Sequence, residues 1–440
     1  MRGFLSIISK KNELAKIKKK VSTKYEIAAV TAKADGSKAL LFENVKESKF
    51  RVVTNLVGTR KRFALAIGAS EDKIHEKVIA AINHPSKPQI VKKAKFMENH
   101  SRDLYTLPIV THFQKEPGPF ITSSVIYTKN QEVGTQNSSF HRLLRLDNRH
   151  FSIRMVEGRH LHRTFMYAKE HGEDLRVAIS IGVHPAVSIA GAYQAEWGKD
   201  ELEIANELLN KKLSLSMCPY SGMLVPSDAE IVMEGRILKD KTHKEWMVEM
   251  LRTYDFKRIQ PVFELERLYF RNNPIFHDVL AGYGEHRLLM GMPIEAKINK
   301  NLKQILPQTK KVVLTEGGCK WLHAVVQISK RQESDPKKII KAAFSAHRSL
   351  KNVVVVDDDI DPSDPVSVEY AMATRFQADK DLMVIPKVRG SSLDPSSDQK
   401  NLLTTKMGVD ATKSFSKRAE GFEIARIPGT EKISLKNYFK

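Results

Sequence analysis

A run of Val-, Ile- and Phe-rich segments between residues 107 and 270 constrains the fold more than any other feature of this chain. Several of the segments alternate in polarity, which is typical of strands. They are FITSSVIYT (120–128), FSIRMV (151–156), RVAISIGV (176–183), EIVMEGRIL (230–238) and PVFELERLYF (261–270). One helical stretch, residues 200–213, interrupts them, with Asp200 as its N-cap and acids in its first turn. This pattern predicts a barrel or a strongly bent sheet with connecting helices.

The segment before this β-rich centre reads as mixed α/β. KYEIAAVTA (24–32) and FRVVTNLVG (50–58) have the composition of strands. SEDKIHEKVIAAIN (70–83) has the periodicity of a helix, with Ser70 as its cap. We therefore expect an N-terminal α/β domain over residues 1–105.

The segment after the centre also changes character. KVVLTE (311–316) and NVVVVDDD (352–359) are short apolar runs, as in strands that are buried on both faces. A helical stretch, residues 335–350, lies between them, and this order favours a parallel α/β unit. The whole chain is thus predicted to be an α+β protein with a central domain over 106–303 and a C-terminal α/β domain and tail over 304–440.

Composition limits the possible partners and location. The formal net charge is +21, but basic residues are spread along the chain without a nucleic-acid motif, so a nucleic-acid partner is disfavoured. No apolar stretch is long enough to predict a membrane span. The two cysteines, Cys218 and Cys319, are too few for a disulfide framework, which indicates a reducing, cytoplasmic setting.

Three polar residues of the centre form a candidate metal site. Asn137 follows a strand and a glycine turn, His160 follows the segment that ends at Val156, and Glu201 opens the helix after Asp200. An amide oxygen, an imidazole nitrogen and a carboxylate suit Mn2+ or Mg2+. A structural role for His160 stays open, and a zinc site built on His160, His162 and His171 is a weaker alternative without a zinc motif.

An ordered set of motifs gives the chain a resemblance. NSSFHR, IRMVEGRHLHR, VAISIGVHPA, DELEIANELL, VPSDAEIVMEGRI, VVVVDDDIDPSD with ATRF, and SSLDPSS occur in one order over roughly residues 105–400. Together they resemble the UbiD family of decarboxylases, and in particular its archaeal members. The resemblance implies that the centre is an FMN-binding split β-barrel that holds prenylated FMN, with Mn2+ or Mg2+ and a nearby K+.

The resemblance also implies residue roles. The metal ligands are Asn137, His160 and Glu201. The cofactor-binding residues are Asn137, Phe140, His141, Arg142, Arg154, Met155, Val156, Arg159 and His160. The catalytic residues are Arg142, the proton donor Glu249 and a first acid, which falls at Lys244 or, with a shift of one residue, at Glu245. The family's Gly-Pro pair between the two acids is missing here.

The implied activity is the non-oxidative decarboxylation of an α,β-unsaturated acid through a prenylated-FMN adduct. Within the family the resemblance favours trans-anhydromevalonate 5-phosphate, converted to isopentenyl phosphate in archaeal isoprenoid biosynthesis. An aromatic quinone-precursor acid, or redox chemistry on plain FMN, are the alternatives. A flavin prenyltransferase would supply the cofactor, and the family suggests a homo-oligomer, either a dimer or a hexamer.

Overall fold

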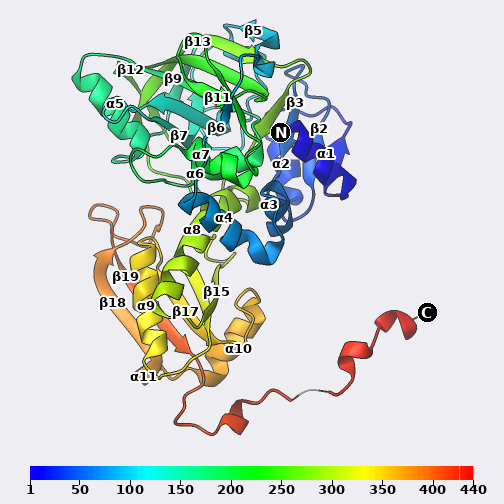
Figure 1. The fold of residues 1–440 in the computed structure, drawn as a ribbon, viewed down its shortest axis with the longest axis vertical. Helices are drawn as coiled ribbons and strands as arrows, with labels where there is room; N and C mark the ends of the chain where they lie inside the picture. Colours follow the sequence, from blue (N-terminus) through cyan, green and yellow to red (C-terminus); the bar gives the residue numbers. More distant parts are fainter. Residues whose placement is uncertain (426, 440) are drawn as a thin grey trace.

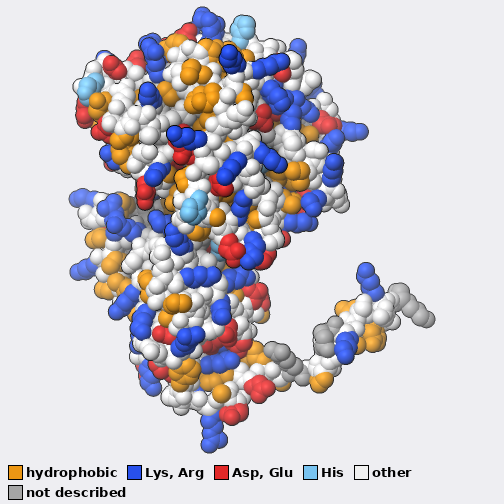
Figure 2. Space-filling model, viewed as in Figure 1, with side chains coloured by type: hydrophobic (Ala, Val, Ile, Leu, Met, Phe, Trp, Pro, Cys, Tyr) orange, Lys and Arg blue, Asp and Glu red, His pale blue; other side chains and the backbone are white. Residues whose placement is uncertain are grey.

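A computed structural model describes residues 1–425 and 427–439. Figure 1 shows two lobes joined by one long helix, α8 (Gly284–Ile305), with the chain's last residues extending away from the body. Lysine and arginine side chains are spread over both lobes and mixed with acidic ones (Figure 2). In the described residues, no helix combines the length and apolar character needed to cross a membrane.

The N-terminal region is a four-stranded sheet with helices around it. Its strand order is β1-β2-β3-β14, and β14 is contributed by a segment more than two hundred residues further along the chain. The strands are β1 (Leu14–Ile17), β2 (Ala39–Phe42), β3 (Arg51–Thr54) and β14 (Ile275–Asp278). The helices are α1 (Arg2–Lys10), α2 (Glu26–Lys33), α3 (Arg60–Ala66), η1 (Glu71–Lys73) and α4 (Ile74–Asn83).

The prediction of a strand over residues 24–32 was wrong, because this segment forms helix α2. Its buried residues are Ile27, Ala28 and Thr31, which fall on one helical face. The Thr31 hydroxyl donates to the Ile27 carbonyl one turn earlier, at 2.8 Å. Burial of this helical face outweighs the preference of the β-branched residues for a strand. Ser70 precedes η1 but makes no side-chain capping bond.

The centre is a closed barrel of six strands, in the order β12-β9-β6-β7-β8-β13, with β13 pairing back to β12. This confirms the predicted fold class. The barrel strands are β6 (Phe120–Lys129), β7 (Gln136–Arg145), β8 (His150–Ile153), β9 (Leu175–Ile181), β12 (Ile231–Glu245) and β13 (Arg258–Phe270). Short elements lie beside it: β4 (Gln89–Ile90), η2 (Lys95–Glu98), β5 (Asn99–Ser101), η3 (Leu104–Thr106), β10 (Ser214–Met217) and β11 (Leu224–Pro226).

Closure of the barrel depends on irregular positions in the long β12–β13 pair. The register shifts between Glu234 and Gly235 and again between Leu238 and Thr242. A Cβ atom at Gly235 would lie 2.0 Å from the Glu264 carbonyl oxygen, so only glycine permits this close approach of the strands. Such bulges bend and twist a strand, which lets the sheet curl onto itself.

Three helices cover the barrel, whereas the sequence predicted one. They are α5 (His160–Glu170), α6 (Pro185–Ala192) and α7 (Glu201–Leu208). The start of α7 is as predicted, because the Asp200 side chain accepts a hydrogen bond from the Leu202 amide at 2.9 Å.

The C-terminal lobe is a five-stranded sheet of order β15-β16-β17-β19-β18 with helices packed on it. A strand that the sequence reading missed, β16, precedes the helix and pairs parallel with β17, whereas β15 is antiparallel to β16. The strands are β15 (Thr309–Leu314), β16 (His323–Ile328), β17 (Asn352–Asp357), β18 (Leu382–Arg389) and β19 (Leu403–Ala411). The helices packed on the sheet are α9 (Asp335–Ala346), α10 (Pro365–Arg375) and α11 (Ala378–Asp381). The short turns η4 (Ala419–Phe422), η5 (Thr430–Lys432) and η6 (Leu435–Asn437) lie in the segment that extends away from the body (Figure 1).

Candidate active site

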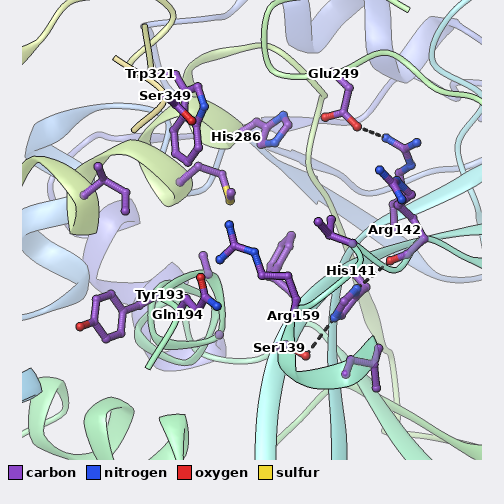
Figure 3. Close-up of a pocket in the computed structure, with 18 of the residues that line it drawn as sticks. Ser139, His141, Arg142, Arg159, Tyr193, Gln194, Glu249, His286, Trp321 and Ser349 are labelled. Atoms are coloured by element: carbon purple, nitrogen blue, oxygen red, sulfur yellow. Dashed lines mark hydrogen bonds and ion pairs between the residues drawn. The ribbon is translucent and has the colours of Figure 1, made fainter. Parts of the chain in front are cut away.

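A cavity of about 710 Å³ lies where the barrel, α8 and the C-terminal lobe meet. Its size suits a cofactor or small molecule, for which pockets of roughly 300–1,000 Å³ are usual. Figure 3 shows Arg142 and Glu249 at one side of it and Trp321 and Ser349 at another, with Arg159 between them. The cavity is therefore walled by two lobes that are joined by α8.

The three predicted metal ligands meet at this cavity. The Asn137 amide nitrogen lies 3.0 Å from both carboxylate oxygens of Glu201 and 3.3 Å from His160 Nδ1. His160 Nδ1 lies 3.8 Å from Glu201 Oε1. The backbone amide of Ser138 donates to the second Glu201 oxygen at 2.8 Å, which holds the carboxylate in place.

This spacing fits a small divalent cation. Ligands bound at about 2.1 Å at right angles lie about 3 Å apart. The observed separations of 3.0–3.8 Å are close to that value, and turning the Asn137 amide would present its oxygen to the ion. Within the described residues, no three His, Cys, Asp or Glu side chains are grouped for a metal, which gives the zinc alternative no support. His171 instead stacks on Tyr167, with ring centroids 4.2 Å apart.

The local fold of β7 explains how one strand presents several of these groups. The register between β6 and β7 shifts between Ile121 and Ser124, opposite Arg142. A bulge beside a strand re-aims the side chains next to it. Asn137 and Arg142, which simple alternation would place on opposite faces, therefore both line the cavity. As predicted, Asn137 follows a strand, β6, and a glycine turn at Gly134, and it lies near the beginning of the next strand, β7.

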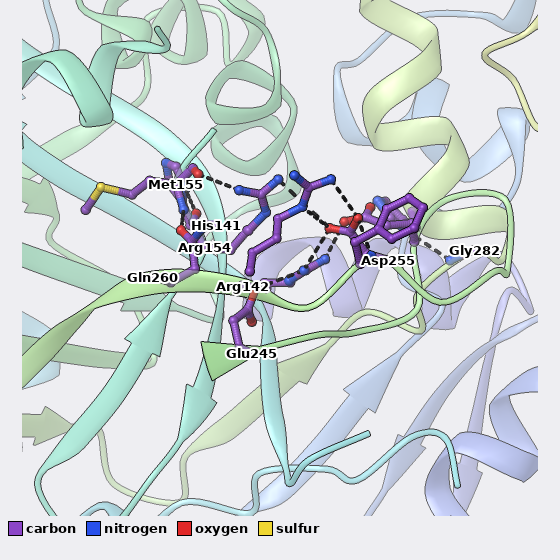
Figure 4. A network of polar contacts seen from close by, with 12 residues as sticks. His141, Arg142, Arg154, Met155, Glu245, Asp255, Gln260 and Gly282 are labelled. Carbon is purple, nitrogen blue, oxygen red and sulfur yellow. Dashed lines mark hydrogen bonds and ion pairs between the residues drawn. The ribbon is translucent and has the colours of Figure 1, made fainter. Parts of the chain in front are cut away.

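Arg142 is held by a set of carboxylates. Its two terminal nitrogens donate to Glu249 and, at 2.9 Å, to Glu245, and Asp255 lies 3.6 Å away. Figure 4 shows Arg142 and Arg154 converging on this acidic group. Burial alone would lower the pKa of Arg142, but the charges of Glu249 and Glu245 raise it well above its usual value. Arg142 is therefore a fixed cation at the cavity wall.

The two candidates for the first acid differ in position. Glu245, the last residue of β12, is fully buried and lies behind Arg142, whereas Lys244 is exposed. One Glu245 oxygen has no hydrogen-bond partner among the described residues, and neither has Arg142 Nε. Glu249 lines the cavity itself, and Glu245 reaches it only through Arg142.

Most of the predicted cofactor-binding residues line the cavity. Met155 does not: its side chain is buried, and its backbone amide donates to Gln260 Oε1 at 2.7 Å. Burial lowers the pKa of His141 to about 4, so its ring is neutral, with Nδ1 2.8 Å from the Arg154 carbonyl oxygen. The predicted residues on the cavity wall are Asn137, Phe140, His141, Arg142, Arg154, Val156, Arg159, His160, Glu201 and Glu249.

Sequence reasoning missed the second wall of the cavity. His286 in the first turn of α8 lines it beside Arg142 and Glu249, and its Nδ1 accepts from the Gly282 amide at 3.0 Å. Burial lowers the pKa of His286. From the C-terminal lobe come Trp321 and residues 345–349. No sequence motif marks these positions. Only the periodicity of α8 could have indicated that one face of this helix lines a cavity.

Comparison with known proteins identifies the family. Family models for the N-terminal, Rift-related and C-terminal domains of 3-octaprenyl-4-hydroxybenzoate carboxy-lyase match residues 5–82, 84–284 and 287–411. The chain belongs to the UbiD family. The UbiD matches divide the chain into three parts, and the boundaries predicted at 105 and 303 stay predictions.

Two curated relatives are similar to this chain over nearly their whole length. The anhydromevalonate phosphate decarboxylase of Methanocaldococcus jannaschii is 42% identical, covering 96% of this chain and 99% of the relative. That of Methanothermobacter thermautotrophicus is 40% identical with the same coverage, 96% and 99%.

Solved structures of UbiD-class enzymes agree with the fold. The enzyme HmfF from Pelotomaculum thermopropionicum in complex with FMN has a TM-score of 0.97 and 38% identity, covering 100% of this chain and 99% of that one. An evolved dimeric form of HmfF in complex with prFMN has a TM-score of 0.93 and 36% identity, with coverage of 100% and 99%.

Proposed function

We propose that this protein is a prenylated-FMN-dependent decarboxylase acting on a phosphorylated α,β-unsaturated acid, trans-anhydromevalonate 5-phosphate, to give isopentenyl phosphate. The observation that carries the proposal is the pairing of Arg142 with Glu249 and Glu245 at a cavity that also holds the group Asn137, His160 and Glu201. The names of the curated relatives support the substrate.

Asn137, His160 and Glu201 would hold Mn2+ or Mg2+, and this ion, with K+ nearby, would bind the flavin's phosphate. Arg159 lines the cavity next to His160 and forms no ion pair with a described carboxylate, so an anionic phosphate suits its charge. Phe140, the neutral ring of His141, Arg154, Val156 and the backbone of Met155 would contact the flavin. When bound, prenylated FMN supplies the electron sink that an sp2 carbon needs when CO2 departs.

The protein's own residues then bind and orient the acid. Arg142 offers a guanidinium, which binds a carboxylate with two parallel hydrogen bonds. Glu245 is buried behind Arg142 and fixes the direction of its fork. A substrate carboxylate bound to Arg142 would displace Glu249 from one of the hydrogen bonds that Arg142 donates. It would also place a second negative charge beside the Glu249 carboxyl group. That neighbour favours the protonated form of Glu249, which is the form able to replace CO2 with a proton.

Apolar packing behind these residues limits access of water. Met247 and Val248 are 3% and 2% exposed and belong to a cluster with Phe120, Leu144 and Ala281. The loop that carries Glu249 is therefore anchored on the barrel on its inner side. Exclusion of water strengthens the interaction of Arg142 with an incoming carboxylate.

The test is CO2 release from trans-anhydromevalonate 5-phosphate by protein coexpressed with a flavin prenyltransferase. We expect turnover that requires the prenyltransferase and a divalent cation. Release of CO2 from 4-hydroxybenzoate-type acids instead would favour the quinone-precursor alternative. If the protein released no CO2 and its visible spectrum showed only plain FMN, the redox alternative would be favoured and the proposal rejected. Size-exclusion chromatography with light scattering would test the expected homo-oligomer.

A further inference from the structure

One face of α8 forms a wall of the cavity with graded polarity. His286, Met290, Ile294 and Lys297 all line the cavity, and their spacing of three or four residues places them on the same helical face. The eleven helical steps from His286 to Lys297 span about 16 Å of helix axis. Along this wall, a neutral imidazole beside Arg142 and Glu249 gives way to two apolar side chains and then to an ammonium group.

The far end of this wall is cationic and unpaired. Lys297 and Arg348 line the cavity, are exposed, and form no ion pair with any carboxylate in residues 1–425 or 427–439. Buried Lys406 lies behind them, with its ammonium 2.7 Å from the Arg348 carbonyl oxygen. Burial lowers the pKa of Lys406 to about 8. This end thus concentrates positive charge without the acidic neighbours that surround Arg142.

Two buried ring nitrogens at the same end lack partners. His347 is 9% exposed and Trp321 packs edge-on against it, with ring centroids 4.5 Å apart. Both side chains line the cavity, and neither His347 Nε2 nor Trp321 Nε1 has a hydrogen-bond partner among the described residues. Buried polar atoms without partners are rare in native proteins, so this pair indicates a ligand that supplies them.

The chemistry of these groups selects the ligand. Lysine, arginine and the indole nitrogen are donors only. Burial and the charges of Lys406 and Lys297 lower the pKa of His347 to about 4, although a hydrogen bond with the Trp321 backbone opposes them. The ring is therefore neutral, and its one N–H is directed at the Trp321 carbonyl. A ligand that only accepts hydrogen bonds and carries more than one negative charge, such as a phosphate monoester, matches this set.

We propose that Lys297 and Trp321, with Arg348 at the entrance, bind the phosphate of the substrate beside the neutral ring of His347, while Arg142 binds its carboxylate at the other end of the α8 wall. The proposal rests on the proposed function for the identity of the acid. Met290 and Ile294, between the two ends, would contact the methyl-bearing carbon chain. The flavin's own phosphate is the other source of the same chemistry, and it is assigned here to the metal site at Asn137, His160 and Glu201.

The experiment compares Lys297→Met and Trp321→Phe with Lys300→Met in the flavin-loaded enzyme. Lys300 lies one turn further along α8, and its ammonium bonds Asn83 at 2.9 Å, away from the cavity. We expect Lys297→Met to raise KM for trans-anhydromevalonate 5-phosphate by about 10–100-fold, and Trp321→Phe by a few-fold to about tenfold, with kcat nearly unchanged. Lys300→Met should match the wild type, and all three should retain flavin and metal.

Calorimetric titration with isopentenyl phosphate tests the site without catalysis. Lys297→Met should weaken binding of isopentenyl phosphate about tenfold or more, and should leave binding of isopentenol, which lacks phosphate, unchanged. The proposal is overturned if Lys297→Met weakens binding of isopentenyl phosphate and isopentenol equally, or weakens neither. It is also overturned if Lys297→Met loses its flavin, because that result would assign the cationic cluster to the flavin phosphate. If the wild type failed to release CO2 but bound isopentenyl phosphate through Lys297, only the proposed function would fail.

Discussion

The barrel side of the cavity and the side formed by the C-terminal lobe differ in how their charges are matched. At the barrel, Arg142 contacts Glu245, Glu249 and Asp255, and Asp255 also pairs with Arg258 at 2.9 Å. At the other side, Lys297 of α8 and Arg348 of the C-terminal lobe have no described carboxylate partner. The charge of Arg142 is matched before any ligand arrives, whereas Lys297 and Arg348 gain their counter-charge from the ligand.

This difference indicates that the barrel side orients the reacting groups, whereas the other side selects the substrate by its phosphate. Groups that take part in proton transfer must be fixed within a few tenths of an ångström, and a network of charge-assisted hydrogen bonds provides that. The exposed cations Lys297 and Arg348 can stay solvated until a phosphate binds, because phosphate recognition depends mainly on charge and donor number. We therefore expect changes on the barrel side to lower turnover and changes on the C-terminal side to weaken substrate binding.

The largest expected effect is at Glu249. Glu249→Gln keeps the shape of the side chain and a contact with Arg142 but removes the proton, so kcat should fall by about 10²–10⁴-fold. The visible spectrum should still show bound flavin. The control is Glu266→Gln, on the surface beside Arg102, which should keep full turnover. Undiminished kcat in Glu249→Gln would reject its role as proton donor.

The fold was predictable where a segment's own pattern decides its structure. The barrel strands with alternating or β-branched sequence and the Asp200 cap of α7 followed from local rules. Helix α2 and strands β7 and β16 did not. Strand β7 carries Asn137, Ser139 and His141, polar residues that face a cavity and so disguise the strand's periodicity.

The candidate site was predictable only on its barrel side. Asn137, His160 and Glu201 were placed together by an ordered set of motifs, and their separations of 3.0–3.8 Å agree with that grouping. The choice between Lys244 and Glu245 needed the register of β12, because a shift of one residue exchanges a buried side chain for an exposed one. Lys297 lies on α8 and His347 in the C-terminal lobe, so no local spacing could relate them to Arg142.

A second prediction concerns the junction that fixes the distance between the two sides. Glu295 of α8 is fully buried and contacts Arg60 at 2.7 Å, His75 at 2.8 Å and the Leu314 amide at 2.8 Å. It therefore connects α8 to the helices of the N-terminal region and to strand β15 of the C-terminal sheet. Burial alone would raise the pKa of Glu295, but the hydrogen bond with His75 and the charge of Arg60 bring it to about 2. The carboxylate form is thus favoured by the folded state.

A group with a depressed folded pKa stabilises the protein above its unfolded pKa, about 4.3, and loses that contribution as pH falls toward 2. The difference corresponds to free energy of unfolding on the order of 3 kcal/mol. Glu295→Gln should lower the free energy of unfolding at pH 7 by about that amount and flatten its dependence on pH between about 4.3 and 2. Denaturant titrations at several pH values measure both, and an unchanged pH slope would contradict the assignment.

The third prediction distinguishes the metal site from its neighbours. His160→Ala removes a ligand, and because loss of even an outer-shell partner costs about 10–100-fold in metal affinity, the loss here should be at least as large. Bound metal, measured by atomic emission, and bound flavin should fall together. The control is His162→Ala on the same helix, since among the described residues His162 accepts a single weak bond, from the Gly158 amide at 3.4 Å. Equal metal loss in both variants would revive the zinc alternative.

The smallest expected effect decides which residue orients Arg142. Glu245→Gln keeps an acceptor for the Arg142 nitrogen but removes the buried charge, while Glu249 and Asp255 remain in place. Weakening one charge-assisted hydrogen bond should cost about 1 kcal/mol, or about fivefold in kcat/KM. Lys244→Gln, at the exposed neighbouring position, should change kcat/KM by less than about twofold. The reverse order, with Lys244→Gln more harmful than Glu245→Gln, would mean that β12 presents the other residue to Arg142, and the matched charges of the barrel side would then need a different first acid.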